Sequence, residues 1–240
     1  MKMLLAIDIG NTDITCGVFR GHNLRITRHP SGMAFRLPDI RPRGIIISSV
    51  VPEIDGTIKN ACRKKYGIVP TFVTHRNAGI RIDYPRPDRI GADRLVNVTA
   101  AWKKYRRACL VIDMGTATTF DFVDSRGRYI GGPIVAGMDL MALALFAGTS
   151  KLPYVRPKMQ RRIFPRSTKE AIEAGLFYGY IGILRHMISV IAKKCGKKAP
   201  LIIMTGGLSR LFSKDIGVRC RFEPNLMFEG LKLIHEGLKK

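Results

Sequence analysis

Two copies of one short pattern hold the residues best suited to chemistry in this chain. In each copy an apolar run ends in aspartate and is followed by glycine and threonine: residues 4–12 read LLAIDIGNT, and residues 109–119 read CLVIDMGTATT. Glycine after a buried strand permits a tight turn whose backbone N–H groups can approach a phosphate. Threonine adds a hydroxyl, and aspartate can hold a cation or order the water around it. Each copy therefore indicates a phosphate-binding loop.

The spacing of the two copies indicates a duplication. Their aspartates, Asp8 and Asp113, lie 105 residues apart in a chain of 240. Apolar strand residues follow each loop, so the phosphate would lie in a hairpin bend, and neither GxxxxGK[ST] nor GxGxxG occurs in the chain. An ordinary β-turn would explain a single copy equally well. Two copies at this spacing instead predict a duplicated domain with two facing phosphate loops.

A third carboxylate lies between the two copies, in the stretch Gly91-Ala92-Asp93-Arg94. The residues after it have the spacing of an amphipathic helix, with Leu95 and Val98 on its buried face. Asp93 therefore falls near a helix start. From the residues alone, the simplest interpretation is a carboxylate that caps this helix.

Length and composition limit the class of protein. The 240 residues, 46% of them hydrophobic, suffice for one large domain or two of about 100 to 140 residues. No apolar stretch reaches the roughly 18 residues that span a bilayer, and the first strand follows directly after Met1-Lys2-Met3. The five cysteines are scattered and lack metal-binding spacing. We expect a soluble cytoplasmic protein without a signal peptide, membrane segment or structural zinc.

The net charge of +23 is the most unusual feature of the composition. Such a charge could attract nucleic acid or an acidic membrane, or raise the local concentration of anionic substrates such as nucleotides. The basic residues form short clusters, at residues 103–107, 156–162, 193–198 and 239–240, without a recognisable nucleic-acid motif. We therefore expect a solvated basic surface that does not serve to bind nucleic acid.

Strand and helix patterns alternate along the chain, which predicts an α/β fold. A meander of three strands is expected over residues 3–28, with a turn at Gly21-His22-Asn23, and again over residues 108–130, with a turn at residues 124–127. Further strands are expected at residues 45–51, 69–73 and 201–205, and helices at residues 53–66, 138–145, 168–192 and 226–240. Residues 82–90 are too rich in proline for regular structure, and residues 131–137 form a flexible glycine stretch.

The sequence does not decide the role of two groups of glycines. Gly175, Gly179 and Gly182 give the helix over residues 168–192 small surfaces that suit helix contacts, dimerisation or a ligand. Gly206 and Gly207 end the strand over residues 201–205, where a nucleotide contact and a plain turn are equally good explanations.

Taken in order, these motifs resemble those of the type III pantothenate kinases, members of the acetate and sugar kinase, heat-shock 70 and actin superfamily. The matching phrases are Asp8-Ile9-Gly10-Asn11-Thr12, Ser48-Ser49-Val50-Val51-Pro52, Gly91-Ala92-Asp93-Arg94, Asp113-Met114-Gly115-Thr116-Ala117-Thr118-Thr119, Gly131-Gly132, Thr205-Gly206-Gly207 and the stretch from Pro224 to Leu231. The resemblance implies two actin-like (ribonuclease H-like) α/β domains, residues 1–100 and 101–240, with mixed five-stranded sheets flanked by helices and a cleft between them. It also implies a homodimer that completes the pantothenate pocket.

The resemblance further implies an activity, transfer of the γ-phosphate of ATP to pantothenate, the first step of coenzyme A synthesis. The ATP-binding residues would be Asp8, Ile9, Gly10, Asn11, Thr12, Asp13, Ile14, Thr15 and Thr116. Asp8 would organise Mg²⁺ with the ATP, and Asp113 would bind a monovalent cation, K⁺ or NH₄⁺. Such a cation would offset phosphate charge without taking part in the chemistry.

The resemblance replaces the capping interpretation of Asp93. This residue matches the family's general base, which takes the proton from the pantothenate hydroxyl. The residues implied to bind this substrate are Tyr84, Gly91, Ala92, Asp93, Arg94 and Thr168. The guanidinium of Arg94 could hold an anionic oxygen of the substrate.

Three stretches depart from the family pattern. The region between Arg28 and Gly44 is short, Ala136 stands where the family has the second proline of GGxIxPG, and residues 165–168 read PRST in place of GKNT. Two other functions therefore stay open, a non-catalytic relative that acts in gene regulation and a kinase for another small hydroxyl substrate on the same fold.

Overall fold

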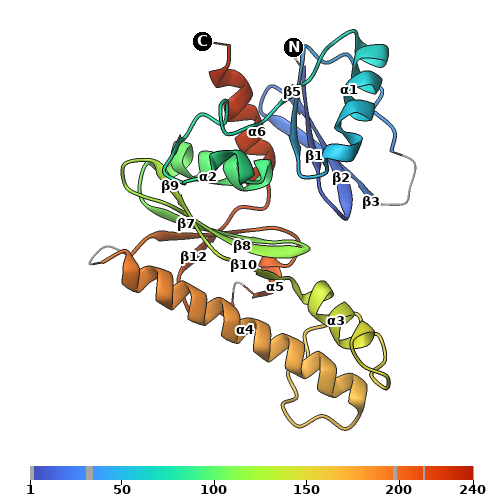
Figure 1. Ribbon diagram of the computed structural model, residues 1–240, viewed down its shortest axis with the longest axis vertical. Coiled ribbons are helices and arrows are strands. Elements are labelled where there is room, and N and C mark those ends of the chain that lie inside the picture. The colour runs from blue at the N-terminus through green and yellow to red at the C-terminus, as the bar shows by residue number, and fades with distance from the viewer. Residues whose placement is uncertain (1–2, 31–34, 197–198, 213, 240) are drawn as a thin grey trace. The chain divides into compact units, whose positions relative to one another are not determined.

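The computed structural model describes residues 3–30, 35–196, 199–212 and 214–239 (Figure 1). Met1, Lys2, Lys197, Lys198 and Lys240, which belong to expectations stated above, lie outside the described residues. The chain forms two compact units. Unit 1 comprises residues 1–106, 123–130 and 225–240, and unit 2 comprises residues 107–122 and 131–224. The expected division at residue 100 stays a prediction, because these units are defined by contacts and the chain returns twice to unit 1.

The first sheet has five strands in the order β3-β2-β1-β4-β5, as expected. The strands are β1 (Met3–Ile9), β2 (Asp13–Arg20), β3 (Asn23–Pro30), β4 (Gly44–Ser49) and β5 (Thr71–Phe72). Strand β1 is antiparallel to β2 and parallel to β4, so the sheet is mixed. The predicted meander is confirmed, and Gly21 in its second turn has a φ of 65°, which favours glycine.

Alternation along β1 separates an apolar face from a face with small and polar residues. Leu5, Ile7 and Ile9 are fully buried and pack against α1 (Pro52–Tyr66) in one hydrophobic cluster. Burial of each such side chain stabilises the fold by about 1.5–3 kcal/mol. On the other face Gly17 leaves room for the ring of Phe228, because a Cβ here would lie 2.4 Å from that ring. Asp8 belongs to this second face.

Two helices of unit 1 pack closely together, α2 (Ala92–Tyr105) and α6 (Leu226–Gly237). Gly230 permits the approach, since a Cβ at this position would lie 2.5 Å from the carbonyl oxygen of Val96. Lys104 and Glu229 form an ion pair of 3.0 Å across the same pair of helices. The predicted closing helix is thus confirmed, and it anchors the helix that carries Asp93.

The second sheet repeats the strand order of the first. Its strands are β7 (Cys109–Met114), β8 (Ala117–Val123), β9 (Arg128–Gly131), β10 (Ile134–Ala136), β11 (Leu201–Thr205), β12 (Cys220–Phe222) and β6 (Arg81–Ile82). The order β9-β8-β7-β11-β12 matches β3-β2-β1-β4-β5 element by element, which agrees with the expected duplication. With β6 and β10 the sheet has seven strands where five were expected. Strand β10 lies in the stretch 131–137, which the sequence predicts to be flexible. Strand β6 ends at Ile82, the first residue of the stretch 82–90 predicted to be irregular, and that stretch also contains a 3-10 turn over Pro87–Arg89.

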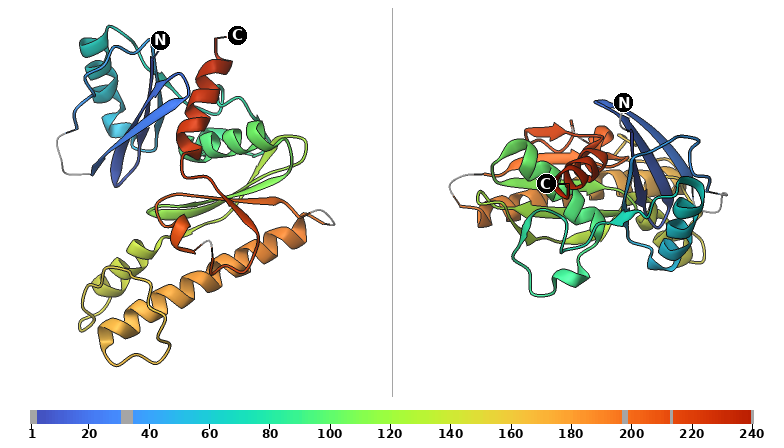
Figure 2. Two further views of the ribbon diagram at one scale, coloured as in Figure 1. Left: turned by 180° about the vertical axis from the view of Figure 1, so that it is seen from behind. Right: turned by 90° about the horizontal axis from the view of Figure 1, so that it is seen from above.

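Unit 2 contains α3 (Met138–Ala147), α4 (Thr168–Lys194) and the short α5 (Ser209–Phe212). With 27 residues α4 is long and apolar enough to cross a membrane, contrary to the expectation that no such stretch exists. Figures 1 and 2 show α4 as one long helix. Its buried residues recur every fourth position and join the hydrophobic cluster of unit 2: Ile172, Leu176, Tyr180, Leu184 and Ile188. This pattern is typical of a core helix.

Candidate active site

The first hairpin places the expected ATP loop at the tip of β1 and β2. Its turn closes with a hydrogen bond of 2.9 Å from the Gly10 N–H to the carbonyl oxygen of Asp13. Ile9 is buried, and Asn11 and Thr12 are exposed at the tip. The remaining loop residues, Asp13, Ile14 and Thr15, are partly buried at the start of β2. A tight, exposed turn that contains a glycine suits close approach of a phosphate.

Asp8 lies between two hydroxyl-bearing residues. In the sheet register it pairs with Thr15 on β2 and with Ser48 on β4, so the three side chains share one face. The Ser48 hydroxyl is buried and has no hydrogen-bond partner among the residues that the structure describes. A buried polar group normally finds a partner, so this hydroxyl suits a ligand or an ion beside Asp8.

The next residue, Ser49, has a structural role instead. Its hydroxyl donates to the carboxylate of Asp55 at 2.5 Å and accepts from the N–H of Val51 at 3.2 Å. These bonds fix the connection from β4 into α1. Two adjacent serines thus serve different purposes because successive side chains of a strand point to opposite faces.

Asp93 lies in the first turn of α2, whose N-cap residue is Gly91. A Cβ on Gly91 would lie 2.4 Å from Oδ1 of Asp93 and 3.5 Å from a methyl group of Val50, so the glycine makes room for the carboxylate. The N–H of Val50 donates to the carbonyl oxygen of Ile9 at 3.0 Å. Asp8 and Asp93 therefore both border the end of β4.

The helix start also contacts the carboxylate of Asp93 directly. The backbone N–H of Arg94 donates to Oδ1 of Asp93 at 2.8 Å, and the positive end of the α2 dipole favours a negative charge here. Ala92 is buried, while Asp93 and Arg94 are partly exposed. The capping and proton-accepting interpretations both need an ionised carboxylate, so the contact agrees with either.

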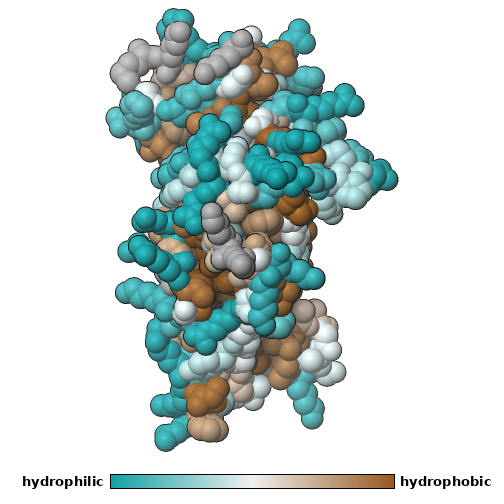
Figure 3. Space-filling model, turned by 90° about the vertical axis from the view of Figure 1, so that its left-hand side faces the viewer, coloured by the Kyte–Doolittle hydropathy of each residue, from teal (hydrophilic) through white to brown (hydrophobic). Residues whose placement is uncertain are grey.

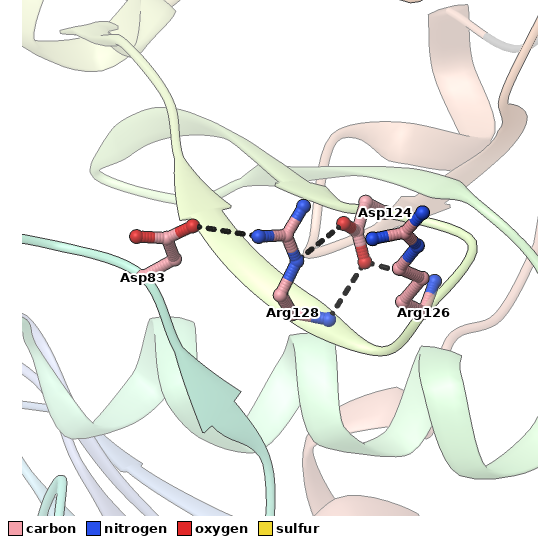
Figure 4. Close-up of polar contacts among 4 residues, drawn as sticks. All are labelled: Asp83, Asp124, Arg126 and Arg128. Carbon is pink, nitrogen blue, oxygen red and sulfur yellow. Dashed lines mark hydrogen bonds and ion pairs between the residues drawn. The ribbon is translucent and has the colours of Figure 1, made fainter.

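Tyr84 follows β6 in an exposed segment of unit 1. Its side chain is 42% exposed, as suits a residue that meets a ligand. The segment starts at Asp83, whose N–H donates to the carbonyl oxygen of Tyr129 at 2.9 Å. Arg128 on β9 bonds the Asp83 carboxylate at 3.1 Å and the Asp124 carboxylate at 2.8 Å (Figure 4). This network fixes the start of the segment.

The Asp124 carboxylate is ionised in this network. Burial alone would raise its pKa, but the hydrogen bonds from Arg128 and from the backbone of Arg126, with the charge of Arg128, outweigh burial. The pKa of Asp124 therefore lies below its ordinary value of 3.8.

The second hairpin, in unit 2, has a similar turn in more crowded surroundings. The Gly115 N–H donates to the carbonyl oxygen of Ala117 at 3.1 Å, and Thr116 is exposed at the tip. Asp113 pairs in register with Thr205 of β11. Gly206, with a φ of 87°, follows Thr205, and a Cβ on it would lie 2.5 Å from Oδ1 of Asp113. The glycine turn after β11 thus packs directly on this aspartate.

A buried pair of hydroxyls lies near Asp113. The hydroxyls of Thr118 and Tyr180 are 2.5 Å apart. Burial raises the pKa of Tyr180 to about 12, and the negative charges of Asp113 and Asp139 add to the shift against the opposing Thr118 hydrogen bond. These carboxylates are therefore close enough to act on the Tyr180 hydroxyl. Carboxylate, hydroxyl and carbonyl oxygens are the ligands that hard cations prefer.

Thr168 is the exposed first residue of α4. Its neighbour Ser167 is the N-cap and accepts from the N–H of Glu170 at 3.2 Å, while the Glu170 carboxylate accepts from the N–H of Arg166 at 2.9 Å. Thr168 also lines an apolar groove of about 750 Å³ between α3 and α4. The hydrogen bonds at the start of α4 are thus made by the neighbours of Thr168, and the exposed Thr168 side chain can face a ligand.

The sequence model that describes the type III pantothenate kinases matches residues 4–190 of this chain. The chain belongs to the type III pantothenate kinase family. It is 36% identical to a type III pantothenate kinase of Syntrophotalea carbinolica, over 97% of this chain and 98% of that protein. It is also 36% identical to one of Geobacter sulfurreducens, over 98% of each. The predicted family is thereby confirmed.

Solved structures support the fold. A protein of Campylobacter jejuni described as a conserved putative Baf family transcriptional activator has a TM-score of 0.61, 19% identity and 98% coverage of both chains. A putative 2-dehydro-3-deoxygalactonokinase of Sinorhizobium meliloti has a TM-score of 0.58, 11% identity and 99% coverage of both chains. At these identities the likeness concerns the fold alone, and it confirms the predicted α/β class with two sheets flanked by helices.

The site residues expected of a type III pantothenate kinase divide between the two units. Unit 1 holds residues 8–15, Tyr84 and the stretch 91–94, and unit 2 holds Asp113, Thr116 and Thr168. Three further residues were not assigned a role from sequence: Ser48, Arg128 and Gly206. Ser48 could have been found from sequence, because it is a polar residue at the end of the buried run 45–47. Nothing in the sequence pairs Arg128 with Asp83.

Proposed function

We propose that this protein transfers the γ-phosphate of ATP to pantothenate and forms 4′-phosphopantothenate, the first step of coenzyme A biosynthesis. The observation that carries the proposal is the carboxylate of Asp93, for which Gly91 leaves space beside the end of β4. The same end of β4 carries Ser48, the register partner of Asp8. A proton acceptor and a phosphate-loop aspartate thus belong to one neighbourhood of unit 1. Membership of the type III pantothenate kinase family supports the choice of substrate.

In the proposed reaction the pantothenate hydroxyl attacks the γ-phosphorus of ATP while the bond from that phosphorus to the β,γ-bridging oxygen breaks. Asp93 accepts the hydroxyl proton, and ADP leaves. Phosphoryl transfer needs alignment and charge neutralisation more than covalent help from the protein. The chain supplies alignment through the first hairpin for ATP, and through Tyr84, Gly91, Ala92, Arg94 and Thr168 for pantothenate.

Two cations fit the donors present. Asp8 and the buried Ser48 hydroxyl offer oxygen ligands for the Mg²⁺ that accompanies ATP, which neutralises phosphate charge. Asp113, near the Thr118 and Tyr180 hydroxyls, offers oxygens for a monovalent cation such as K⁺ or NH₄⁺. Thr116, at the tip of the second hairpin, would contact ATP.

The test is an ATP-dependent pantothenate kinase assay of the wild-type protein and Asp93→Asn. Asparagine serves as well as aspartate at a helix start, so the fold persists while the proton acceptor is lost. We expect kcat to fall by about 10²- to 10⁴-fold, the usual contribution of a general base. The matched control is Glu53→Gln, which neutralises an exposed acid in the first turn of α1. Wild-type protein without phosphopantothenate product, or Asp93→Asn with full activity, would contradict the proposal.

The same assay separates the alternatives. A panel of small hydroxyl compounds would reveal a kinase for another substrate, and wild-type protein inactive on all of them would favour a non-catalytic role. A role in gene regulation requires sequence-selective binding to duplex DNA that persists at physiological salt. A net charge of +23 alone gives weak, unspecific binding that salt removes.

We also propose that the protein is a cytoplasmic homodimer. Exposed apolar residues on α3 support an interface there: Leu140, Leu143, Leu145 and Phe146. The neighbouring groove also includes Gly175 and Gly179, where an added Cβ would meet nothing within 4 Å. On the face drawn in Figure 3, hydrophobic side chains are exposed among hydrophilic ones. Light scattering on Leu143→Asp should show a monomer, and the control Val69→Asp, which changes an exposed apolar residue of unit 1, should remain dimeric.

A further inference from the structure

One arginine joins two carboxylates that are far apart in the sequence. Arg128 donates from Nη1 to Oδ2 of Asp83 at 3.1 Å and from Nε to Oδ2 of Asp124 at 2.8 Å (Figure 4). The arginine side chain is 32% exposed. A guanidinium holds its donors in a rigid, planar fork, so both bonds constrain the same group. Arg128 therefore connects Asp83 to the turn between β8 and β9.

Hydrogen bonds and packing hold the turn between β8 and β9 in place. Oδ1 of Asp124 accepts from the N–H of Arg126 at 2.9 Å and from the N–H of Arg128 at 2.8 Å. Gly127, with a φ of 75°, packs against the indole of Trp102, because a Cβ here would lie 2.4 Å from that ring. The position of Arg128 is thus fixed through the turn and through α2.

The segment that Arg128 holds is mostly exposed. It begins after the two-residue strand β6, which pairs in parallel with β9. Asp83, Tyr84, Pro85 and Arg86 are all exposed, and the ion pair between Arg86 and Asp88 lies within the segment itself. A 3-10 turn over Pro87–Arg89 closes on the segment itself, and α2 begins after Gly91. Tyr84 therefore depends on Asp83 and its neighbours for its position.

We propose that Arg128 is a positioning residue for the acceptor substrate, acting through Asp83 on Tyr84. The inference rests on the proposed function, in which Tyr84 contacts pantothenate. Without the bridge, residues 83–90 sample more conformations, and substrate binding must order them at an entropic cost. The cost falls on pantothenate binding alone, since neither the first hairpin nor Asp93 is altered.

The experiment compares Arg128→Gln and Asp83→Asn with the wild-type protein. We expect each variant to raise the KM for pantothenate about five- to tenfold, the effect of losing a partly exposed ion pair with a defined geometry. The KM for ATP and the kcat at saturating pantothenate should stay unchanged. The double variant should be no worse than either single one, because both remove the same bridge. Arg128→Lys, which keeps the charge without the fork, should fall between the wild-type protein and Arg128→Gln.

Arg126→Gln is the matched control, because it changes an arginine of the same turn. Only the backbone of Arg126 contacts Asp124 in the network of Figure 4, so its variant should behave as the wild-type protein. A pantothenate KM within about twofold of the wild-type value in Arg128→Gln would overturn the proposal. A fall in kcat of about five- to tenfold, with the KM values for pantothenate and ATP both unchanged, would overturn it too. That result would describe a purely structural role for Arg128.

Amide hydrogen exchange of residues 83–91 gives a second readout that does not depend on the substrate. Arg128→Gln should exchange faster in this peptide than the wild-type protein and Arg126→Gln. Equal exchange in all three would overturn the bridge. The two readouts can also disagree: the wild-type protein could lack pantothenate kinase activity while Arg128→Gln still exchanges faster. That outcome would refute the proposed function, but the bridge itself would stand.

Discussion

The two Asp-Gly-Thr hairpins have the same strand frame and different surroundings. In each, the strand that carries the aspartate is parallel to a following strand, β4 for Asp8 and β11 for Asp113. Each turn closes through a glycine N–H, at 2.9 Å for Gly10 and 3.1 Å for Gly115. Asp8, however, has as its register neighbour Ser48, whose buried hydroxyl has no partner in the described part of the chain, whereas backbone packs on Asp113 through Gly206. One sequence pattern thus provides two different sites.

This difference follows from what comes after the parallel strand. After β4 the chain continues through Ser49 into α1, and the buried Ser48 hydroxyl has no hydrogen-bond partner among the residues that the structure describes. After β11 the chain turns back at Gly206 with a left-handed φ, over Asp113 and Met114. A hydroxyl such as that of Ser48 suits an exchangeable ligand such as Mg²⁺ with ATP. A carboxylate against which the backbone packs suits a cation that stays in place.

The largest effect should come from Asp8→Asn. Asparagine fits the same space, but it lacks the charge that would hold Mg²⁺ with ATP, so we expect kcat/KM for ATP to fall by about 10²- to 10³-fold. Initial rates over a series of Mg²⁺ and ATP concentrations measure this effect, and thermal unfolding checks the fold. An unchanged Mg²⁺ dependence would show that Asp8 is no cation ligand and would remove the proposed difference between the hairpins.

Gly206→Ala tests the crowding around Asp113. An alanine Cβ would lie 2.5 Å from Oδ1 of Asp113 and 2.6 Å from backbone atoms of Met114, at a φ of 87° that disfavours it. We expect the free energy of unfolding to fall by about 2–4 kcal/mol, the sum of backbone strain and displacement of the aspartate. Urea denaturation measures the loss. The control is Gly207→Ala, since a Cβ on Gly207 meets nothing within 4 Å. Equal stability of both variants would contradict the packing described.

The strand frame could be predicted from sequence because local patterns determine it. Continuous apolar runs, glycine turns and helical periodicity predicted both meanders, α2 and α6 correctly. Strands β6 and β10 were missed, since two or three residues carry no periodic signal and owe their conformation to a distant partner. The capping box of α4 was readable, because Ser167 and Glu170 have the required spacing.

The site was predictable only in part. The aspartates stood out because each interrupts an apolar run, and the family resemblance gave them roles that their patterns alone could not. The bridge from Asp83 through Arg128 to Asp124 had no signal, because its ends are 45 and 4 residues from the arginine in a chain with 41 basic residues. Ion pairs between distant segments depend on the folded arrangement, which local sequence does not encode.

A smaller effect is expected for Asp113→Asn. If Asp113 holds a monovalent cation that offsets phosphate charge, the variant should lose K⁺ stimulation and about tenfold in activity, equivalent to 1.4 kcal/mol in the barrier. Activity measured with K⁺, NH₄⁺ and Na⁺ in turn would show the loss. The Mg²⁺ dependence should stay as in the wild-type protein, in contrast to Asp8→Asn. A variant that keeps its response to K⁺ would place the cation elsewhere.

The smallest effect concerns the second turns of the two meanders. The turn between β2 and β3 has no carboxylate, whereas Asp124 in the turn between β8 and β9 is ionised with a pKa below 3.8. A lowered folded-state pKa stabilises the fold above the unfolded value, and this stabilisation is lost as the pH falls through the folded pKa. Asp124→Asn should therefore be less stable than the wild-type protein at pH 7, by up to about 1 kcal/mol for so exposed a network. Urea denaturation from pH 7 down to pH 3 should show this difference shrink below about pH 4. A difference that is independent of pH would mean that the turn needs the hydrogen bonds of residue 124 and not its charge.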